Sequence, residues 1–174
     1  MKIRMTIPAW LGLLIYTLLP ACEGHGGTKT TVSHASAKEG KARVVVRPFT
    51  AEGIEKDDAG GIEESFCTNL QQRGVNSLCS SDIKAMFQHK QQQILLGDCD
   101  SEDCMSQIGR ITEADTVIQV TLSRVGRRYV FGVGIYDGKS GALKTRLAHE
   151  VDVERIEGLL DHLPGLAEQV QAQL

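Results

Sequence analysis

The sequence lacks the signatures of several large classes of protein. Its 174 residues carry 19 basic and 22 acidic side chains, so it has no excess of positive charge of the kind that nucleic-acid-binding domains use. It contains no P-loop and no serine elbow of the G-x-S-x-G kind. Gly132 and Gly134 lack the third glycine of a dinucleotide-binding fingerprint and lie in a predicted strand with no helix after it. These absences argue against nucleic acid as a partner and against the commonest enzyme classes.

Long apolar runs are also missing. The stretch from Ile7 to Ala21 carries no charge, but it is shorter than the roughly 20 residues of a membrane-spanning helix. Lys2 and Arg4 precede it, and the small residue Ala21 ends it, which is typical of a secretory signal. An uncleaved anchor helix is the less favoured alternative, because the run is too short and contains two prolines.

The end of this run, Leu19-Pro20-Ala21-Cys22, resembles the bacterial lipobox. That motif implies cleavage between Ala21 and Cys22 and attachment of fatty acyl chains such as palmitate through the cysteine thiol, which would hold the protein at a membrane. We therefore predict residues 1–21 as a lipoprotein signal peptide; an ordinary signal with an incidental cysteine is the alternative. Lipoproteins with an aspartate after the cysteine often stay at the inner membrane. Glu23 here predicts the outer membrane, with the protein facing the periplasm.

The rest of the chain divides into a linker and a domain. Residues 22–41 hold a single valine and many Gly, Ser and Thr residues, so we predict a lipidated cysteine followed by a flexible linker. Residues 42–174 are enough for a single periplasmic domain with its own core. Removal of Lys2 and Arg4 with the signal lowers the net charge from −3 to −5, which disfavours nucleic acid and anionic lipid headgroups as partners.

Four further cysteines lie in the predicted domain. Export implies an oxidising compartment, where an even number of cysteines usually forms disulfides. Three pairings are possible, and the local one is favoured, with Cys67 bonded to Cys79 and Cys99 bonded to Cys104. A zinc site is the alternative, but neither segment has the two-residue gap that zinc knuckles use. We therefore predict two disulfides and no metal or cofactor.

The first half of the domain has the pattern of a βαβ unit. Val44–Val46 is a continuous β-branched run, typical of a strand covered on both faces. The charged, glycine-rich residues 50–61 are predicted as a loop. Apolar residues then recur at intervals of four, which places them on one helix face: Ile62, Phe66 and Leu70. With a second strand at Val75–Cys79, the two strands are expected to be parallel.

Two more helices and a meander are expected after this unit. Ser80, Ser81 and Asp82 can cap a helix that carries an apolar stripe and ends in a frayed polar segment at residues 89–93; the stripe is Ile83, Met86 and Phe87. Asp98, Asp100 or Ser101 can cap the next helix, which holds Cys104, Ile108 and Ile111.

The last third of the chain alternates apolar and polar residues and predicts three antiparallel strands, around 118–122, 129–135 and 143–151. A final helix from Ile156 to Val170 is expected to kink or break at Pro164-Gly165. The predicted fold class is therefore α/β, or α+β, with a mixed sheet of about five strands and helices packed on it.

No catalytic set emerges from the remaining polar residues. The acidic cluster from Asp98 to Asp103 lacks the central glycine and distal glutamate of an EF-hand, and a capped helix start explains it more simply. His89, His149 and His162 fall on different predicted elements. A Cys–His pair could meet only in space, and every cysteine has a predicted structural or lipid role. We therefore expect no catalytic residues.

Several short segments together resemble a known group of envelope proteins. They are RVVVRPF from Arg43, Arg73-Gly74 before the second strand, the Cys99–Cys104 spacing, Ala114-Asp115, and the Asp137–Gly141 hairpin. This pattern, over roughly residues 42–151, resembles the α/β domain shared by the TolB amino-terminal domain, the curli secretion lipoprotein CsgG and the lipoprotein activators of penicillin-binding proteins. The domain is similar in fold to anticodon-binding domains. The resemblance implies protein binding or assembly in the cell envelope, with no catalysis.

The first functional hypothesis is therefore a lipid-anchored periplasmic adaptor that binds an envelope protein. An alternative is a homo-oligomeric ring or collar subunit of a secretion complex. A second alternative is a small-ligand or metal-binding enzyme.

Overall fold

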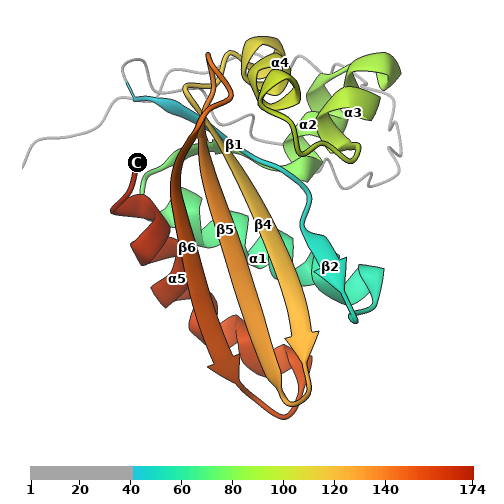
Figure 1. The fold of residues 1–174 in the computed structure, drawn as a ribbon, viewed down its shortest axis with the longest axis vertical. Helices are drawn as coiled ribbons and strands as arrows, with labels where there is room; N and C mark the ends of the chain where they lie inside the picture. The colour runs from blue at the N-terminus through green and yellow to red at the C-terminus, as the bar shows by residue number, and fades with distance from the viewer. Residues whose placement is uncertain (1–40) are drawn as a thin grey trace, which may run out of the picture. The chain divides into compact units, whose positions relative to one another are not determined.

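A βαβ unit opens the described part of this computed structural model, which covers residues 41–174 (Figure 1). Strand β1 (Arg43–Val46) is followed by helix α1 (Lys56–Gln72) and strand β3 (Asn76–Leu78), and β1 and β3 pair in parallel. Val44–Val46 is buried because helices lie against both faces of β1. This unit confirms the predicted strand–helix–strand order.

Residues 50–61 differ from the predicted loop. Strand β2 (Thr50–Glu52) pairs in parallel with the later strand β4, and α1 already begins at Lys56. Asp57 and Asp58 occupy the first turn of α1, where negative charge is favourable. The sequence does not indicate β2, because three residues are too few to show an alternating pattern. It does not indicate the start of α1, because Gly60 and Gly61 are unfavourable in a helix. Packing of α1 on the sheet offsets their cost of about 1 kcal/mol each.

Three helices follow β3: α2 (Ser80–Met86), α3 (His89–Leu96) and α4 (Glu102–Thr112). Cys79, rather than the following polar residues, is the N-cap of α2. Met86, predicted in the apolar stripe, is exposed. The segment expected to fray forms α3, because Leu95 anchors it in the core. The cap of α4 is Ser101, whose hydroxyl accepts a hydrogen bond from the Cys104 N–H.

The predicted meander is confirmed. Strands β4 (Thr116–Val125), β5 (Arg128–Asp137) and β6 (Leu143–Asp152) are antiparallel neighbours. Along the sheet the order is β3-β1-β4-β5-β6, with β2 beside the far half of β4, so the sheet has six strands.

The chain ends in a 3₁₀ helix, η1 (Ile156–His162), and helix α5 (Leu163–Gln171). The expected break falls one residue before Pro164, which sits in the first turn of α5, where its missing N–H costs nothing. None of the helices within residues 41–174 has the length and apolar character needed to cross a bilayer.

Two apolar cores lie on opposite faces of the sheet. The larger lies between the long strands and helices α1, η1 and α5; the smaller lies between β1, the start of β4 and helices α2–α4. Figure 1 shows α1 and α5 behind β4–β6, while α2, α3 and α4 gather at the upper end of the strands. The front face of β4–β6 below α4 is therefore left uncovered by the described helices.

Candidate binding groove

A groove of about 880 Å³ opens at the carboxyl end of β1. Its walls are the β1–β2 connection, the first half of α1, the start of α2 and the α3–α4 loop. β1 is parallel to both of its sheet neighbours, and ligands commonly bind where the connections diverge beyond the carboxyl ends of parallel strands. The fold thus places this groove where a binding site is expected on general grounds.

Glu63 of α1 fixes the floor of the groove. One carboxylate oxygen, Oε2, accepts a hydrogen bond of 3.0 Å from the Phe49 N–H, and the other, Oε1, accepts one from the Ser80 hydroxyl. Glu63 is only 8% exposed. A single side chain therefore joins the β1–β2 connection, α1 and the start of α2.

Burial raises the pKa of the Glu63 carboxyl above its ordinary value of 4.5. The hydrogen bond from Phe49 and the nearby positive charge of Lys84 act in the opposite direction, while Glu64 adds to the rise. Desolvation has the largest effect, because burial removes most of the water that would stabilise the charged carboxylate. Glu63 therefore takes up a proton more readily than an exposed glutamate does.

Arg47 closes the inner end of the groove. Its guanidinium donates hydrogen bonds to the carbonyl oxygens of Gly97 and Cys99, and it is 4% exposed. Its Nε–H donor is buried and has no partner among the described residues. Burial lowers the pKa of Arg47, and the charges of Asp100 and Asp98 partly oppose this shift. The guanidinium stays protonated, so it holds the α3–α4 loop against β1 as a buried cation.

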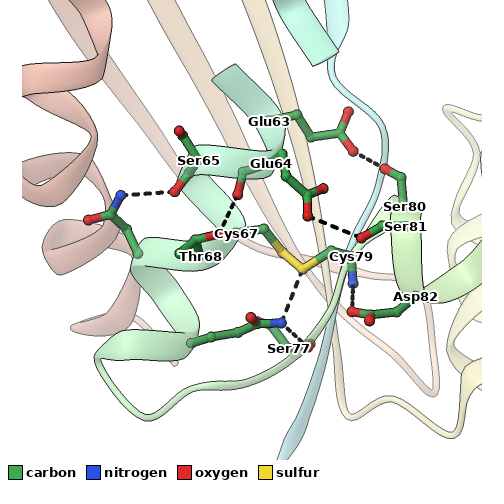
Figure 2. The surroundings of a disulfide bond; sticks show 12 residues. Glu63, Glu64, Ser65, Cys67, Thr68, Ser77, Cys79, Ser80, Ser81 and Asp82 are labelled. Atoms are coloured by element: carbon green, nitrogen blue, oxygen red, sulfur yellow. Dashed lines mark hydrogen bonds between the residues drawn. A yellow bond between two sulfur atoms is a disulfide. The ribbon is translucent and has the colours of Figure 1, made fainter. Parts of the chain in front are cut away.

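One disulfide braces the same wall. Cys67 of α1 is bonded to Cys79, the N-cap of α2, with Cα atoms 6.2 Å apart. Figure 2 shows the bond beside Glu63 and Ser80, with the side chain of Asp82 turned back to accept a hydrogen bond from the Cys79 N–H. The disulfide and the Glu63 contacts together fix the angle between α1 and α2.

The second disulfide lies at the other side of the groove. Cys99 is bonded to Cys104 with Cα atoms 5.9 Å apart. This disulfide connects the α3–α4 loop to the first turn of α4. Arg47 holds the same loop, because it donates a hydrogen bond to the Cys99 carbonyl oxygen. Both walls of the groove are thus covalently constrained.

Exposed charges of both signs line the mouth of the groove. Lys56, Asp57, Glu64 and Lys84 all contribute to its lining and are exposed. No ion pair joins any of these four side chains to another described residue. Their charges are therefore free to meet those of a bound partner.

The described residues do not assemble a recognisable catalytic set. Ser80 contacts a carboxylate, but it is 7% exposed, so its hydroxyl is poorly placed to attack a substrate. No group of three or more metal-binding side chains occurs within residues 41–174. His149 and His162, predicted on different elements, do meet, with ring centroids 6.5 Å apart, while His89 lies exposed on α3. None of these three histidines forms a hydrogen bond with Ser80.

A second, smaller hollow of about 290 Å³ lies on the uncovered sheet face. Polar and glycine positions on β4, β5 and β6 form most of its lining, to which Val133, Tyr136 and Leu147 add apolar surface. Asp100 reaches it from the α3–α4 loop and accepts a hydrogen bond of 2.9 Å from the Gln119 amide. The uncovered sheet face is therefore more polar than the opposite face, which is packed with apolar side chains.

Only part of this site can be predicted from the sequence. The cysteine pairs were predicted, whereas Ala21 and Cys22, the predicted cleavage and lipid-attachment residues, lie outside the described residues. Glu63 and Arg47 were missed. A signal for Glu63 existed, because it stands three, four and seven residues before Phe66, Cys67 and Leu70, on the apolar face of its helix.

The fold is shared with solved bacterial lipoproteins. No protein-family model and no curated protein matches the chain. Among solved structures, lipoprotein GNA1162 from Neisseria meningitidis is 18% identical, with 75% of this chain and 96% of that chain covered and a TM-score of 0.52. The LpoB C-terminal domain from Escherichia coli is 13% identical, with 64% and 83% covered and a TM-score of 0.50. Identities this low show a shared fold, and the fold agrees with the predicted α/β class.

Proposed function

We propose that this protein is a lipid-anchored adaptor on the periplasmic side of the bacterial outer membrane, where its domain binds an envelope protein without catalysing a reaction. The observation that carries this proposal is the open groove beyond β1, whose walls are fixed by Glu63 and two disulfides. A rigid groove pays little conformational entropy on binding.

The chemistry of the groove suits a polypeptide segment. Lys56 and Lys84 can meet carboxylates, while Asp57 and Glu64 can meet basic side chains. Phe49 and Ile54 add apolar surface within the same lining. A protein segment offers both charges and apolar groups over such a length, whereas a small anionic or cationic ligand would leave half of these charges unused.

The anchoring half of the proposal is supported by the lipobox-like residues before Cys22 and by the shared fold with a lipoprotein, GNA1162. Cys22→Ala removes the thiol that would carry the lipid. We expect the variant to move from the membrane fraction to the soluble periplasmic fraction when envelopes are separated. A variant that still sediments with membranes would show that the anchor is something other than a lipid on Cys22.

The binding half is tested at the mouth of the groove. We expect the double variant Lys56→Glu and Lys84→Glu, made in the full chain, to lose the partner recovered by crosslinking and purification from detergent-solubilised envelopes. Lys139→Glu is the matched control, because Lys139 is exposed and lies in the β5–β6 turn, outside the groove lining. Equal recovery from both variants, or no partner with the unaltered chain, would count against the groove.

A further inference from the structure

Strand β6 forms one edge of the sheet. Within residues 41–174 its only strand neighbour is β5. The β4–β5 turn has two residues, and Val125 and Arg128 close it as a pair. Because hydrogen-bonded and non-hydrogen-bonded pairs alternate in antiparallel strands, β5 bonds to β4 through Arg128 and every second residue after it. It bonds to β6 through Tyr129 and every second residue after that.

This alternation fixes which backbone groups of β6 face outward. Arg146, Ala148 and Glu150 lie opposite Gly134, Gly132 and Val130 of β5, at positions that do not bond to β6. The N–H and C=O groups of these three residues therefore point away from the sheet. No described backbone or side-chain group outside the strand pairing bonds to them. The edge is open for pairing.

The side chains along this edge form a self-complementary series. Reading along β6, Arg146 is positive, Ala148 is small and neutral, and Glu150 is negative, and all three are exposed. A second copy placed antiparallel, with Ala148 opposite Ala148, puts each Arg146 opposite a Glu150. Lys144 lies outside this series, because the pairing of β6 with β5 shifts register at this residue and its ammonium is already 3.3 Å from the Asp137 carboxylate. Opposite charges directly across antiparallel strands stabilise the pair.

Other registers are less favourable. Centring the pairing on Arg146 or on Glu150 sets two like charges against each other, which is destabilising. Centring it on His149 sets Glu150 opposite Ala148 and leaves Arg146 only the terminal Asp152. A charged edge normally discourages strand pairing. Here the order of the charges disfavours the registers centred on Arg146 and on Glu150, and it gives the register centred on Ala148 an Arg–Glu pair on each side of its centre.

The existing contacts of these side chains do not oppose such pairing. Glu150 lies 3.6 Å from Arg128, and both side chains are 64% exposed. Surface ion pairs of this kind contribute little to stability, so Glu150 can exchange one cation for another. Arg146 has no ion pair with another described residue. Ala148 adds no bulk at the centre.

We propose that the β6 edge is a homodimerisation surface, on which two copies of this chain pair antiparallel about Ala148. The two sheets then become continuous, and their uncovered faces join into one. A single pair of strands is a small interface, so the dimer is weak and depends on concentration. This surface is separate from the groove, and the proposal does not depend on the proposed function.

Cysteine crosslinking in cells tests the register. In the full chain, Ala148→Cys places two thiols on residues whose Cα atoms lie about 5.5 Å apart in a hydrogen-bonded pair, within reach of a disulfide. With a mild oxidant we expect a dimer on a non-reducing gel that disappears on reduction. Arg146→Cys is the control, because its two copies lie four residues out of register, on the order of 13 Å apart, and should not crosslink.

A charge swap tests the contacts. In the Ala148→Cys background, Arg146→Glu or Glu150→Arg alone replaces two attractive pairs with two repulsive ones, and we expect the dimer to weaken by roughly tenfold. The double swap Arg146→Glu with Glu150→Arg should restore it, which also shows that the single variants had not merely misfolded. Absence of the Ala148→Cys dimer, a crosslink to a different protein, or single reversals that change nothing would overturn the proposal.

Discussion

Removal of the Glu63 carboxylate should destabilise the domain more than removal of an exposed carboxylate such as that of Glu64. Glu63→Ala leaves two donors without an acceptor, the part-buried Phe49 N–H and the buried Ser80 hydroxyl. An unsatisfied buried polar group costs about 1–3 kcal/mol. Two such groups predict a loss of about 2–6 kcal/mol, a large part of the 5–15 kcal/mol that stabilises a typical domain.

Glu63→Gln separates the hydrogen bonds from the charge. The glutamine oxygen can accept from the Phe49 N–H, and its amide can donate to Ser80 once that hydroxyl rotates. The variant keeps both contacts and removes a desolvated charge. We therefore expect it to be at least as stable as the unaltered protein at neutral pH.

The pH dependence follows from the raised pKa of Glu63. Because the folded protein holds this proton more tightly than the unfolded chain does, the stabilisation is complete below the ordinary value of 4.5 and is lost as pH rises through the raised pKa. Glu63→Gln lacks this loss. Its advantage over the unaltered protein should therefore grow as pH rises above about 4.5.

Urea unfolding of the unaltered, Gln and Ala proteins at several pH values between 4 and 8 measures these differences. Glu64→Gln is the matched control, since Glu64 is exposed and adjacent in the same helix. Stability differences between Glu63→Gln and the unaltered protein that stay constant with pH would refute the burial argument. An Ala variant as stable as the Gln variant would refute the hydrogen-bond argument.

Two further predictions concern bracing and close packing. Replacing both Cys67 and Cys79 with alanine opens a link between residues 12 positions apart, and the chain-entropy model predicts a loss of about 3 kcal/mol; a thermal unfolding midpoint unchanged by the double replacement would contradict this. Gly109→Ala should destabilise the domain strongly, because its Cβ would overlap the backbone carbonyl of Gly138, whereas a Cβ at Gly61 meets nothing within 4 Å. Gly61→Ala should stabilise the same protein by up to about 1 kcal/mol. Urea unfolding measures both variants, and equal free energies of unfolding would contradict the packing argument.

The groove could be predicted only in part, because its key residues act across the fold. Glu63 is 14 residues from Phe49 and 17 from Ser80, and Arg47 is 50 residues from Gly97. A charged residue on an apolar face signals that some partner exists, but the sequence does not say which one. The partner depends on how α1, α2 and the α3–α4 loop converge at the end of β1.

The sequence by itself determined the elements that are long enough to show a period: the buried run at Val44–Val46, the apolar face of α1, and the three alternating strands of the meander. Short-range physics governs these features, since side chains a few residues apart share a face. Only the tertiary structure decided that three residues at Thr50–Glu52 form a strand, that the polar segment before Leu95 forms a helix, and that β6 is left at the edge. Each of these depends on backbone or core contacts between segments distant in the chain, whose free energy no local pattern records.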